Sequence, residues 1–462
     1  MADERALLAR AAEIAVGYLD TLDVRPVRPE ADYGAMLAAI DRPVPEDGIE
    51  PLAVLEELAA LAEPGLTAMG SGRYFGFVIG GTLPASLAAD WLVSTWDQNT
   101  GLARVTPATS ALEAVTGRWV LELLGLPAHS SFAFVTGCQM AHVTALAAAR
   151  HAVYERIGYD LPERGLAGAP PLRVVVGAKR HITLTRALRL LGIGQAQEHV
   201  VPVDDQGRMR AELLEDSLGA ADTPTIVCAQ VGEVNTGACD DLETVVAAAH
   251  ARDAWVHVDG AFGLWAAASP GFSHLVRGHA GADSWATDGH KWLNVPYDCG
   301  IAICAHPEMH AAAMEYAAPY LALADSEVER DPMGYSPEFS RRARSLPVWA
   351  AIRALGRTGV AALVEESCAH ARAIAVGLAK LPDCEILNDV VLNQVLFRFG
   401  DDERTAAMVA AVQREGEAWM GQSVWQDRAA IRISVSCWRT DADDVRRTID
   451  AFARAASAHP EY

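Results

Sequence analysis

A lysine and an aspartate in two separate motifs are the residues with the clearest chemical potential. Lys291 stands in the run ADSWATDGHKWLN at 282–294, and Asp259 stands upstream in HVDGA at 257–261. A lysine amine becomes a nucleophile that traps carbonyl groups when burial or a cationic neighbour lowers its pKa. We therefore interpret Lys291 as an imine-forming lysine in an environment of that kind.

The position of Asp259 supports this interpretation. It follows the apolar run 254–258, which predicts a buried strand, so its carboxylate should lie at the carboxyl end of that strand and face the same crevice as Lys291. A carboxylate beside a pyridine nitrogen keeps that nitrogen protonated and turns the ring into an electron sink. The pair thus favours an aldehyde cofactor with a pyridine ring, pyridoxal 5'-phosphate (PLP).

Two further segments could contact such a cofactor. Thr136-Gly137-Cys138-Gln139 joins the predicted strand 132–135 to an apolar helix, and free N–H groups at a helix N-terminus bind phosphate. His181 stands at another strand-to-helix junction, where its ring could stack on a flat cofactor. A glycine-containing turn or a lone histidine is more often purely structural, so both interpretations stay open on these residues alone.

Composition excludes several classes of partner. The chain has 462 residues and a formal net charge of −22, which argues against nucleic acid or an anionic membrane as partner. No apolar run is long enough to span a membrane, and the acidic start of the chain does not resemble a signal peptide. The eight cysteines show no CxxC pair and several lie in apolar runs, so we expect reduced core residues of a cytoplasmic protein.

A metal centre is not expected. Alternation along a strand puts His257 and Asp259 on one face, but no third ligand with suitable spacing follows them. We therefore predict that the protein uses no metal.

The middle of the chain predicts an α/β fold. Apolar strands alternate with helical segments from Ser131 onward, which indicates a mainly parallel sheet covered on both sides. The predicted strands are 132–135, 172–176, 199–203, 225–230, 254–258, 284–286 and 300–305.

Three parts follow from this pattern. Residues 1–70 read as an N-terminal helical segment, residues 71–345 as the large domain and residues 346–462 as a smaller C-terminal α+β domain. The helices expected in the last part are 346–355, 360–380 and 402–415, with strands at 383–387, 393–398 and 430–435. Residues 318–342 lack periodicity and read as a long loop, a feature that is usually functional or disordered.

The motifs together resemble a known family. HVDGAFG, ADSWATDGHKWLN, VTGCQMAHVTALAAAR, AKRHITLTRAL and AIRISVSCWRT resemble the group II PLP-dependent decarboxylases, the family of the aromatic amino acid and glutamate decarboxylases. The resemblance runs in the same order from about Arg73 to the last helix. It implies PLP fold type I, with a seven-stranded sheet domain, a small C-terminal domain and a homodimer whose active sites lie at the interface. The N-terminal segment would then contribute to the dimer.

The resemblance also implies a role for individual residues. Lys291 would hold PLP as an imine, Asp259 would pair with the ring nitrogen, and His181 would stack on the ring. The remaining cofactor contacts would be Ala261 on the opposite ring face, Asn235 near the ring hydroxyl, and Gly137, Cys138 and His290 at the phosphate.

The implied reaction is decarboxylation of an L-amino acid to an amine through an external aldimine and a quinonoid. Lys291 or His181 could assist the final protonation, and Tyr335 is the tyrosine that the loop offers as proton donor, although it is displaced by a few positions from the family's place for it. Loss of that tyrosine is associated in the family with oxidative deamination to an aldehyde, so this outcome remains an alternative. A PLP carbon–carbon lyase or an aminotransferase would need the same residues.

The substrate side of the site departs from the aromatic branch of the family. Gln98 and Asn99 stand where that branch has apolar groups, and Arg432 stands where the glutamate branch binds a substrate carboxylate. Phe77 matches the family's apolar pocket wall. We therefore expect a polar or acidic amino acid as substrate, while a structural ion pair remains the alternative role for Arg432.

Overall fold

The computed structural model describes residues 3–220, 222–314 and 330–458. Part of the predicted loop at 318–342 falls outside these residues. In the described part of the chain, no helix is long and apolar enough to cross a membrane.

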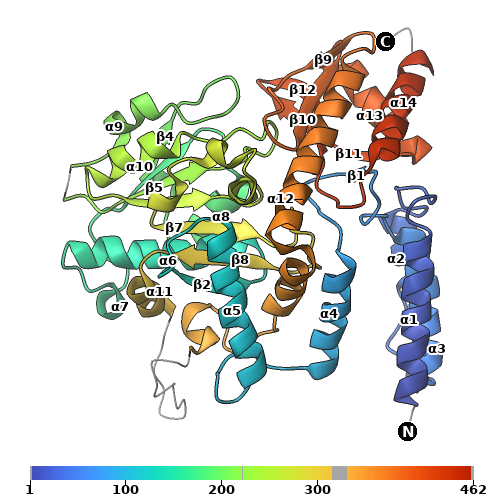
Figure 1. Ribbon diagram of the computed structural model, residues 1–462, viewed down its shortest axis with the longest axis horizontal. Coiled ribbons are helices and arrows are strands. Elements are labelled where there is room, and N and C mark those ends of the chain that lie inside the picture. Colours follow the sequence, from blue (N-terminus) through green and yellow to red (C-terminus); the bar gives the residue numbers. More distant parts are fainter. Residues whose placement is uncertain (1–2, 221, 315–329, 459–462) are drawn as a thin grey trace.

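A seven-stranded sheet forms the centre of the large domain (Figure 1). Its order is β2-β8-β7-β6-β5-β3-β4, and of these seven strands β8 runs antiparallel to both its neighbours. The mainly parallel sheet is the predicted one, and the predicted fold class is confirmed. The strands are β2 (Ser131–Val135), β3 (Arg173–Gly177), β4 (Glu198–Val201), β5 (Thr225–Gln230), β6 (Trp255–Asp259), β7 (Ser284–Asp288) and β8 (Gly300–Cys304).

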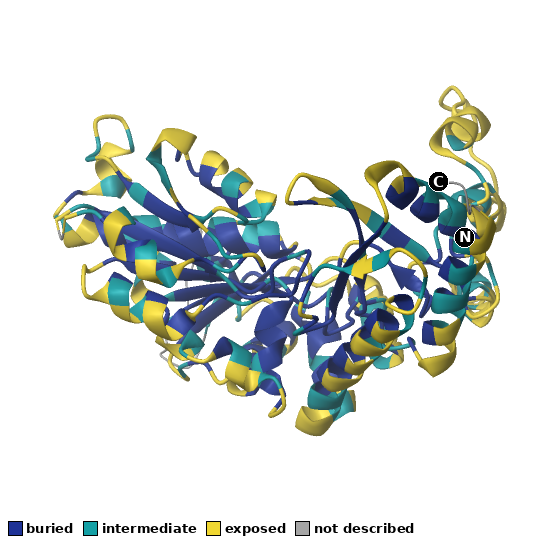
Figure 2. Cartoon of the chain, turned by 90° about the horizontal axis from the view of Figure 1, so that it is seen from above, coloured by how far each residue is buried: buried dark blue, intermediate teal, exposed yellow. Residues whose placement is uncertain are grey.

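Continuous apolar runs along the strands explain why helices cover both faces of the sheet, because successive side chains point to opposite faces. Val174 and Val176 pack in one core cluster with residues of α6 and α8, whereas Val175 packs in a second cluster with residues of α5 and α10. Figure 2 shows the strands dark blue and buried, with exposed residues on the outer helices. The helices of this domain are α4 (Pro84–Trp96), α5 (Pro107–Leu123), α6 (Cys138–Arg156), α7 (Leu161–Arg164), α8 (Ile182–Leu190), α9 (Leu214–Ser217), α10 (Leu242–His250) and α11 (Pro307–Met314).

The small domain has a five-stranded sheet in the order β1-β11-β12-β10-β9. Helices α13 (Asp402–Glu415) and α14 (Ala442–Ala458) pack on it through a second apolar core. Strand β11 was not predicted, and β1, from the segment assigned to the large domain, pairs with it in parallel. The strands are β1 (Tyr74–Phe75), β9 (Cys384–Ile386), β10 (Gln394–Phe399), β11 (Trp419–Trp425) and β12 (Arg428–Ser434).

One long helix joins the two domains. The predicted helices at 346–355 and 360–380 are the two halves of α12 (Ser345–Leu378), which kinks at Gly356, where φ is 64°. Its first half contributes Val348 and Ile352 to the core of the large domain, and its second half contributes Ile374 to the core of the small domain. The two cores are therefore tied by one continuous element.

The N-terminal helices form a separate arm. α1 (Glu4–Asp20), α2 (Tyr33–Ile40) and α3 (Pro51–Ala62) stand beside α4 at one end of the molecule and contain no buried residue (Figure 1). α1 begins where the Asp3 carboxylate accepts the N–H groups of Arg5 and Ala6, and α3 begins with Pro51 at its first turn. α2 was not predicted.

A buried ion pair anchors the chain that leads into α12. Arg341 is buried and donates to both carboxylate oxygens of Glu113 in α5, at 3.0 and 2.9 Å. The same guanidinium donates to the carbonyls of Thr100, at 2.9 Å, and Phe134, at 2.7 Å. Arg341 thus ties the chain before α12 to Thr100, to α5 and to β2.

We expect Arg341→Met to lower the free energy of unfolding by about 3–5 kcal/mol, because Glu113 would lose its main partner and remain buried. Arg342→Met is the matched control, since Arg342 is more than a third exposed and pairs with Asp90 at the surface, where such pairs contribute at most about 1 kcal/mol. Urea unfolding curves would measure both. Equal stability of the two variants would contradict the anchoring role.

Candidate active site

Two neighbouring strands end at the residues that the motifs single out. Asp259 is the last residue of β6 and is paired in register with Ala286 of β7, which ends at Asp288. Lys291 comes three residues later. Because β6 and β7 are adjacent and parallel, Asp259, Asp288 and Lys291 lie together at one edge of the sheet.

The environment of Lys291 differs from the expectation of a lowered pKa. Burial acts to lower its pKa, but the carboxylates of Asp288 and Asp259 and the thiol of Cys138 outweigh burial, and the pKa is raised. The Lys291 Nζ lies 3.1 Å from Asp288 Oδ2. The expectation of a lowered pKa was wrong, since a positive charge on the amine compensates the carboxylates around it.

Asp259 is a buried carboxylate that stays ionised. Burial alone would raise its pKa, but His142, His181 and Lys291 lower it, and the net direction is well below the usual range. The His142 Nε2 lies 3.5 Å from Asp259 Oδ2. The site therefore contains a fixed negative charge that is shielded from water.

The N-terminus of α6 meets the end of β7. The Cys138 N–H donates to Asp288 Oδ1 at 2.6 Å, so the carboxylate occupies the anion-binding end of a 19-residue helix. Gly137, with φ at 155°, precedes the helix, and a Cβ there would lie 3.2 Å from the His290 ring. A glycine at this turn lets the helix end approach His290 closely.

His290 has a defined tautomer. Its Nδ1 accepts the Cys299 N–H at 3.1 Å, so Nε2 carries the proton, and Nε2 lies 3.5 Å from Asp288 Oδ1. Burial lowers the pKa of His290, which keeps the ring neutral. The Tyr297 ring stacks on it at 4.3 Å between centroids. The Nε2–H of His290 and the Cys138 N–H at the N-terminus of α6 thus both face Asp288 Oδ1.

His181 lies among the charged groups of the site. It is the N-cap of α8, and its Nδ1 accepts the N–H of Thr183 at 3.3 Å, which leaves the proton on Nε2. Burial lowers its pKa, and Lys291 and Arg432 lower it further while Asp259 raises it. The structure therefore brings a neutral imidazole close to Asp259, Lys291 and Arg432.

Two other predicted cofactor contacts lie near these residues. The Ala261 N–H donates to Asp259 Oδ1 at 3.2 Å, so Ala261 is adjacent to the carboxylate. Asn235 is buried, and its side chain donates to Glu233 Oε1 at 3.0 Å and accepts from Ser423 of β11 at 2.6 Å. Asn235 thus links the two domains, and its contact with a ring hydroxyl stays a prediction.

Arg432 belongs to the small domain and lies near His181 and Glu233 of the large domain. It lies on β12, paired with Leu396 and Gly421, and its buried Nε has no hydrogen-bond partner. Burial lowers its pKa, and the nearby Glu233 acts in the opposite direction. No carboxylate of the described residues forms a salt bridge with Arg432.

Three predicted substrate contacts lie at the surface of the single chain. Phe77 is 62% exposed and its ring packs against Trp419, while Gln98 and Asn99 are also exposed. The Gln98 amide donates to the Trp96 carbonyl, and the Asn99 side chain accepts from the N–H of Arg341. Among the residues that the structure covers, none of the three contacts Lys291 or Asp259, so their substrate role stays a prediction.

Tyr335 contacts Arg330 and His310 and packs against the apolar cluster that contains Cys138 and Ala261. It lies in the short helix Pro332–Tyr335, where the Arg330 guanidinium stacks at 4.2 Å from its ring centroid and His310 packs edge-on at 5.3 Å. The described part of the chain shows no contact between Tyr335 and Lys291. Its role as proton donor stays a prediction, and residues 315–329 of that loop lie outside the described structure.

Two residues of the site were not predicted. Asp288 stands three positions before Lys291, a spacing that could have indicated a contact between them. His142 stands four positions after Cys138, on the same face of α6, but nothing in the sequence indicates that this face meets β6. Cys138, His142 and Asp259 each offer a ligand atom within 4.8 Å of the others, a grouping that strand spacing alone did not reveal.

The donor set fits PLP. A lysine amine is available for an imine, an ionised carboxylate lies on the neighbouring strand, and a helix N-terminus with the His290 N–H offers donors for a phosphate. The Nε2 of Gln139, in the first turn of α6, is buried without a partner. An acceptor such as a phosphate oxygen would satisfy it.

Known proteins are similar over most of the chain. Residues 34–400 match the family model described as the pyridoxal-dependent decarboxylase conserved domain. The aromatic-L-amino-acid decarboxylase of Bacillus atrophaeus is 24% identical, with 96% of this chain and 93% of that protein covered. The L-2,4-diaminobutyrate decarboxylase of Rhizobium meliloti (strain 1021) is 27% identical, with 90% of this chain and 84% of that protein covered.

A solved structure shares the fold. The crystal structure of Oryza sativa TDC with PLP and tryptamine superposes with a TM-score of 0.92 and 23% identity, covering 99% of this chain and 98% of that one. The family match spans well over half of the chain and includes the strands that carry Asp259 and Lys291. The chain belongs to the group II PLP-dependent decarboxylase family, as its motifs indicated, and its cofactor is PLP.

Proposed function

We propose that this enzyme decarboxylates a polar or acidic L-amino acid to the corresponding amine. The observation that carries the substrate class is Arg432, a half-buried residue near His181 whose buried Nε has no hydrogen-bond partner and which has no salt bridge to a described carboxylate. A partly buried guanidinium without an ionic partner is costly unless a ligand supplies the negative charge.

Lys291, Asp259 and His181 carry the chemistry in this proposal. PLP, when bound, supplies the electron sink for the pair of electrons that the departing carboxylate leaves behind. Lys291 is the amine that would hold the cofactor, and Asp288 Oδ2, at 3.1 Å, is in hydrogen-bond distance to take a proton from it. Asp259 would keep a bound ring nitrogen protonated, and the neutral His181 ring would contact the cofactor.

The phosphate would bind at the N-terminus of α6. Gly137 and the Cys138 N–H form that end of the helix, and the Nε2–H of His290 faces it. The Asp288 carboxylate accepts the Cys138 N–H in this structure. A phosphate bound at the same N–H would lie close to this carboxylate, and the two negative charges would repel each other. A phosphate there would therefore displace Asp288 from this N–H. Ala261 and Asn235 would complete the cofactor contacts.

The position of Tyr335 favours a second outcome, oxidative deamination to an aldehyde. If Arg330 and His310 hold Tyr335 away from the reacting carbon, protonation slows and the carbanion persists. Molecular oxygen would then be reduced to peroxide while the amino group leaves as ammonia. The decarboxylation step is common to both outcomes, so the products decide between them.

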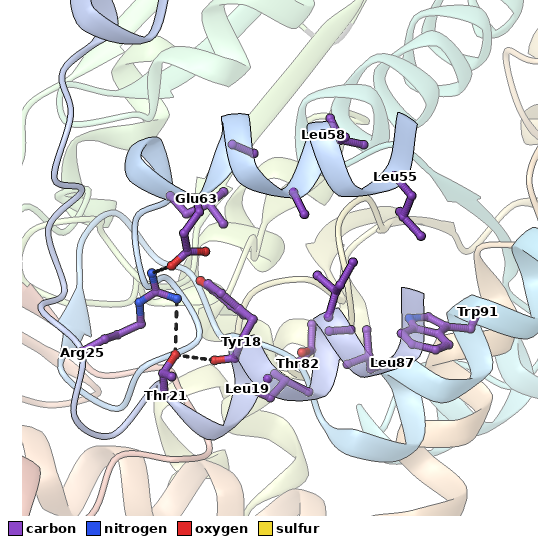
Figure 3. Close-up of a pocket in the computed structure, with 16 residues that line it drawn as sticks. Tyr18, Leu19, Thr21, Arg25, Leu55, Leu58, Glu63, Thr82, Leu87 and Trp91 are labelled. Carbon is purple, nitrogen blue, oxygen red and sulfur yellow. Dashed lines mark hydrogen bonds and ion pairs between the residues drawn. The ribbon is translucent and has the colours of Figure 1, made fainter. Parts of the chain in front are cut away.

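We also infer a homodimer in which the N-terminal arm packs on a second copy of the chain. Apolar side chains of α1, α3 and α4 surround a cavity of about 620 Å³, and Leu58 is 62% exposed (Figure 3). An unburied amphipathic arm on a single chain favours association with another surface. Phe77, Gln98 and Asn99, which are exposed here, would meet substrate if the dimer placed them at its active site.

The first test identifies the products. The holoenzyme is incubated with each amino acid, and CO2, amine, ammonia and peroxide are measured. We expect CO2 and an equal amount of amine, and none from Lys291→Ala, which lacks the imine-forming amine. Borohydride should also reduce a PLP adduct onto the wild-type chain but not onto the variant. Ammonia and peroxide without amine would show the oxidative outcome instead, and an aldehyde without CO2 would show a lyase.

The second test concerns Arg432. We expect Arg432→Ala to raise the KM for substrates with a side-chain carboxylate roughly 10- to 100-fold, because a charge-assisted hydrogen bond contributes about 1.5–3 kcal/mol. Arg428→Ala, on the same strand, removes a half-exposed arginine paired with Glu385 and should leave KM unchanged. An unchanged KM of Arg432→Ala for every accepted substrate would refute the carboxylate-binding role.

The third test concerns the arm. Leu58→Asp should shift the protein from dimer toward monomer in sedimentation velocity, because it puts a charge into the apolar face. Leu190→Asp is the control, since Leu190 is equally exposed, at 64%, but lies on α8 of the large domain. If the wild-type chain sediments as a monomer at micromolar concentration, the inferred interface does not exist.

A further inference from the structure

A row of buried polar side chains leads from Asp259 into the core of the large domain. His142 Nε2 lies 3.5 Å from Asp259 Oδ2, and His142 Nδ1 lies 2.9 Å from His257 Nε2. His257 Nδ1 lies 2.9 Å from Ser284 Oγ, which also lies 2.9 Å from Trp255 Nε1. All five side chains are buried, and they come from α6, β6 and β7. We call this row the histidine relay.

The hydrogen positions in the relay follow from its two ends. An indole N–H can only donate, so Ser284 Oγ accepts from Trp255 and is free to give its own proton to His257 Nδ1. His257 then carries its proton on Nε2 and donates to His142 Nδ1. His142 must therefore carry its proton on Nε2, which faces Asp259.

The opposite orientation of the relay is unfavourable. If Ser284 accepted from both neighbours, His142 would donate to His257 and present a bare Nε2 lone pair to the Asp259 carboxylate. Burial and the neighbouring His142 lower the pKa of His257 to about 3, so a second proton on that ring does not relieve the conflict. The Asp259 carboxylate therefore selects one direction of donation, and Ser284 supplies the donor that this direction needs at its other end.

We propose that His142 is a positioning residue that holds Asp259 ionised and correctly aimed, in a tautomer that His257, Ser284 and Trp255 support. The inference rests on the proposed role of Asp259 at the ring nitrogen. Without an N–H donor at this place, a buried carboxylate gains a proton more easily, and a neutral Asp259 no longer favours a protonated ring.

Other groups around Asp259 do not replace His142. His181 and Lys291 also lower its pKa, but Lys291 is paired with Asp288 at 3.1 Å and would be consumed by the imine. The Cys138 Sγ lies 3.4 Å from His142 Nε2 and accepts from the same N–H rather than offering one to Asp259. The relay remains in place when Lys291 reacts, because none of its members takes part in the imine.

The test compares His142→Leu, which removes the donor, with His142→Gln, whose amide can restore an N–H near the Nε2 position. Each apo variant is titrated with PLP labelled with ¹⁵N in the ring. We expect His142→Leu to weaken PLP binding roughly tenfold and to shift the ring-nitrogen signal to its unprotonated position between about pH 6 and 9. His142→Gln should restore most of both properties.

Three further variants make the outcome decisive. His279→Gln is the control for loss of a histidine, because His279 bonds to the carbonyls of Val276 and Leu124 outside the relay, and it should match the wild type. Ser284→Ala keeps His142 but frees the tautomer of His257, and should shift the ring-nitrogen signal in the same direction by a smaller amount. It also replaces His142→Leu if that variant does not fold.

Asp259→Asn separates failure of the relay from failure of the proposed function. If Asp259→Asn shifts the ring-nitrogen signal while His142→Leu, or Ser284→Ala in its place, leaves both the signal and PLP affinity at wild-type values, the relay proposal is overturned. If Asp259→Asn itself has no effect on the signal, the role of Asp259 at the ring nitrogen is overturned as well.

Discussion

Burial of negative charge at the ends of two adjacent strands is the constraint on which the site depends. Asp259 ends β6 and Asp288 ends β7, and both carboxylates are almost fully buried. A buried carboxylate is costly unless it is paired and hydrogen-bonded. The histidine relay compensates Asp259, while Lys291 and the N-terminus of α6 compensate Asp288. Lys291 is thereby held between the two carboxylates.

The same arrangement explains why the pKa of Lys291 is raised although the side chain is shielded from water. Lysine in a purely apolar pocket would lose its proton, but here a carboxylate lies 3.1 Å from its amine. A phosphate at the end of α6 would compete with Asp288 for the Cys138 N–H. In this interpretation, Asp288 couples cofactor binding to the release of Lys291 from its ion pair.

The site lies where the two domains meet, and this position makes it dependent on their junction. Asn235 of the large domain accepts from Ser423 of the small one, and Arg432 reaches the site from β12. α12 contributes its first half to the core of the large domain and its second half to the core of the small domain, with the kink at Gly356 between them. A site built across such a junction can place a substrate-binding arginine on one domain and the reactive lysine on the other.

Sequence reasoning reached the fold class and the succession of strands along the chain, because these depend on local signals. Apolar strands alternate with helices, and Asp259 and Lys291 stand at or just beyond the ends of strands, where α/β sheets place their chemistry. The motifs also sufficed to indicate PLP. The short strands β1 and β11 were missed, since two residues of β1 have no periodicity and β11 alternates only weakly.

Only the tertiary structure could place His142 under Asp259, Asp288 at the end of α6, and Tyr335 between Arg330 and His310. The contacts of His142 with Asp259 and of Asp288 with α6 join segments far apart in the chain, whereas Arg330 and Tyr335 are near neighbours in sequence. Their geometry depends on how helices pack on the sheet and not on any local pattern. The charge of Lys291 was misjudged for the same reason: a pKa depends on neighbours in space, and the sequence by itself determined only which groups could titrate.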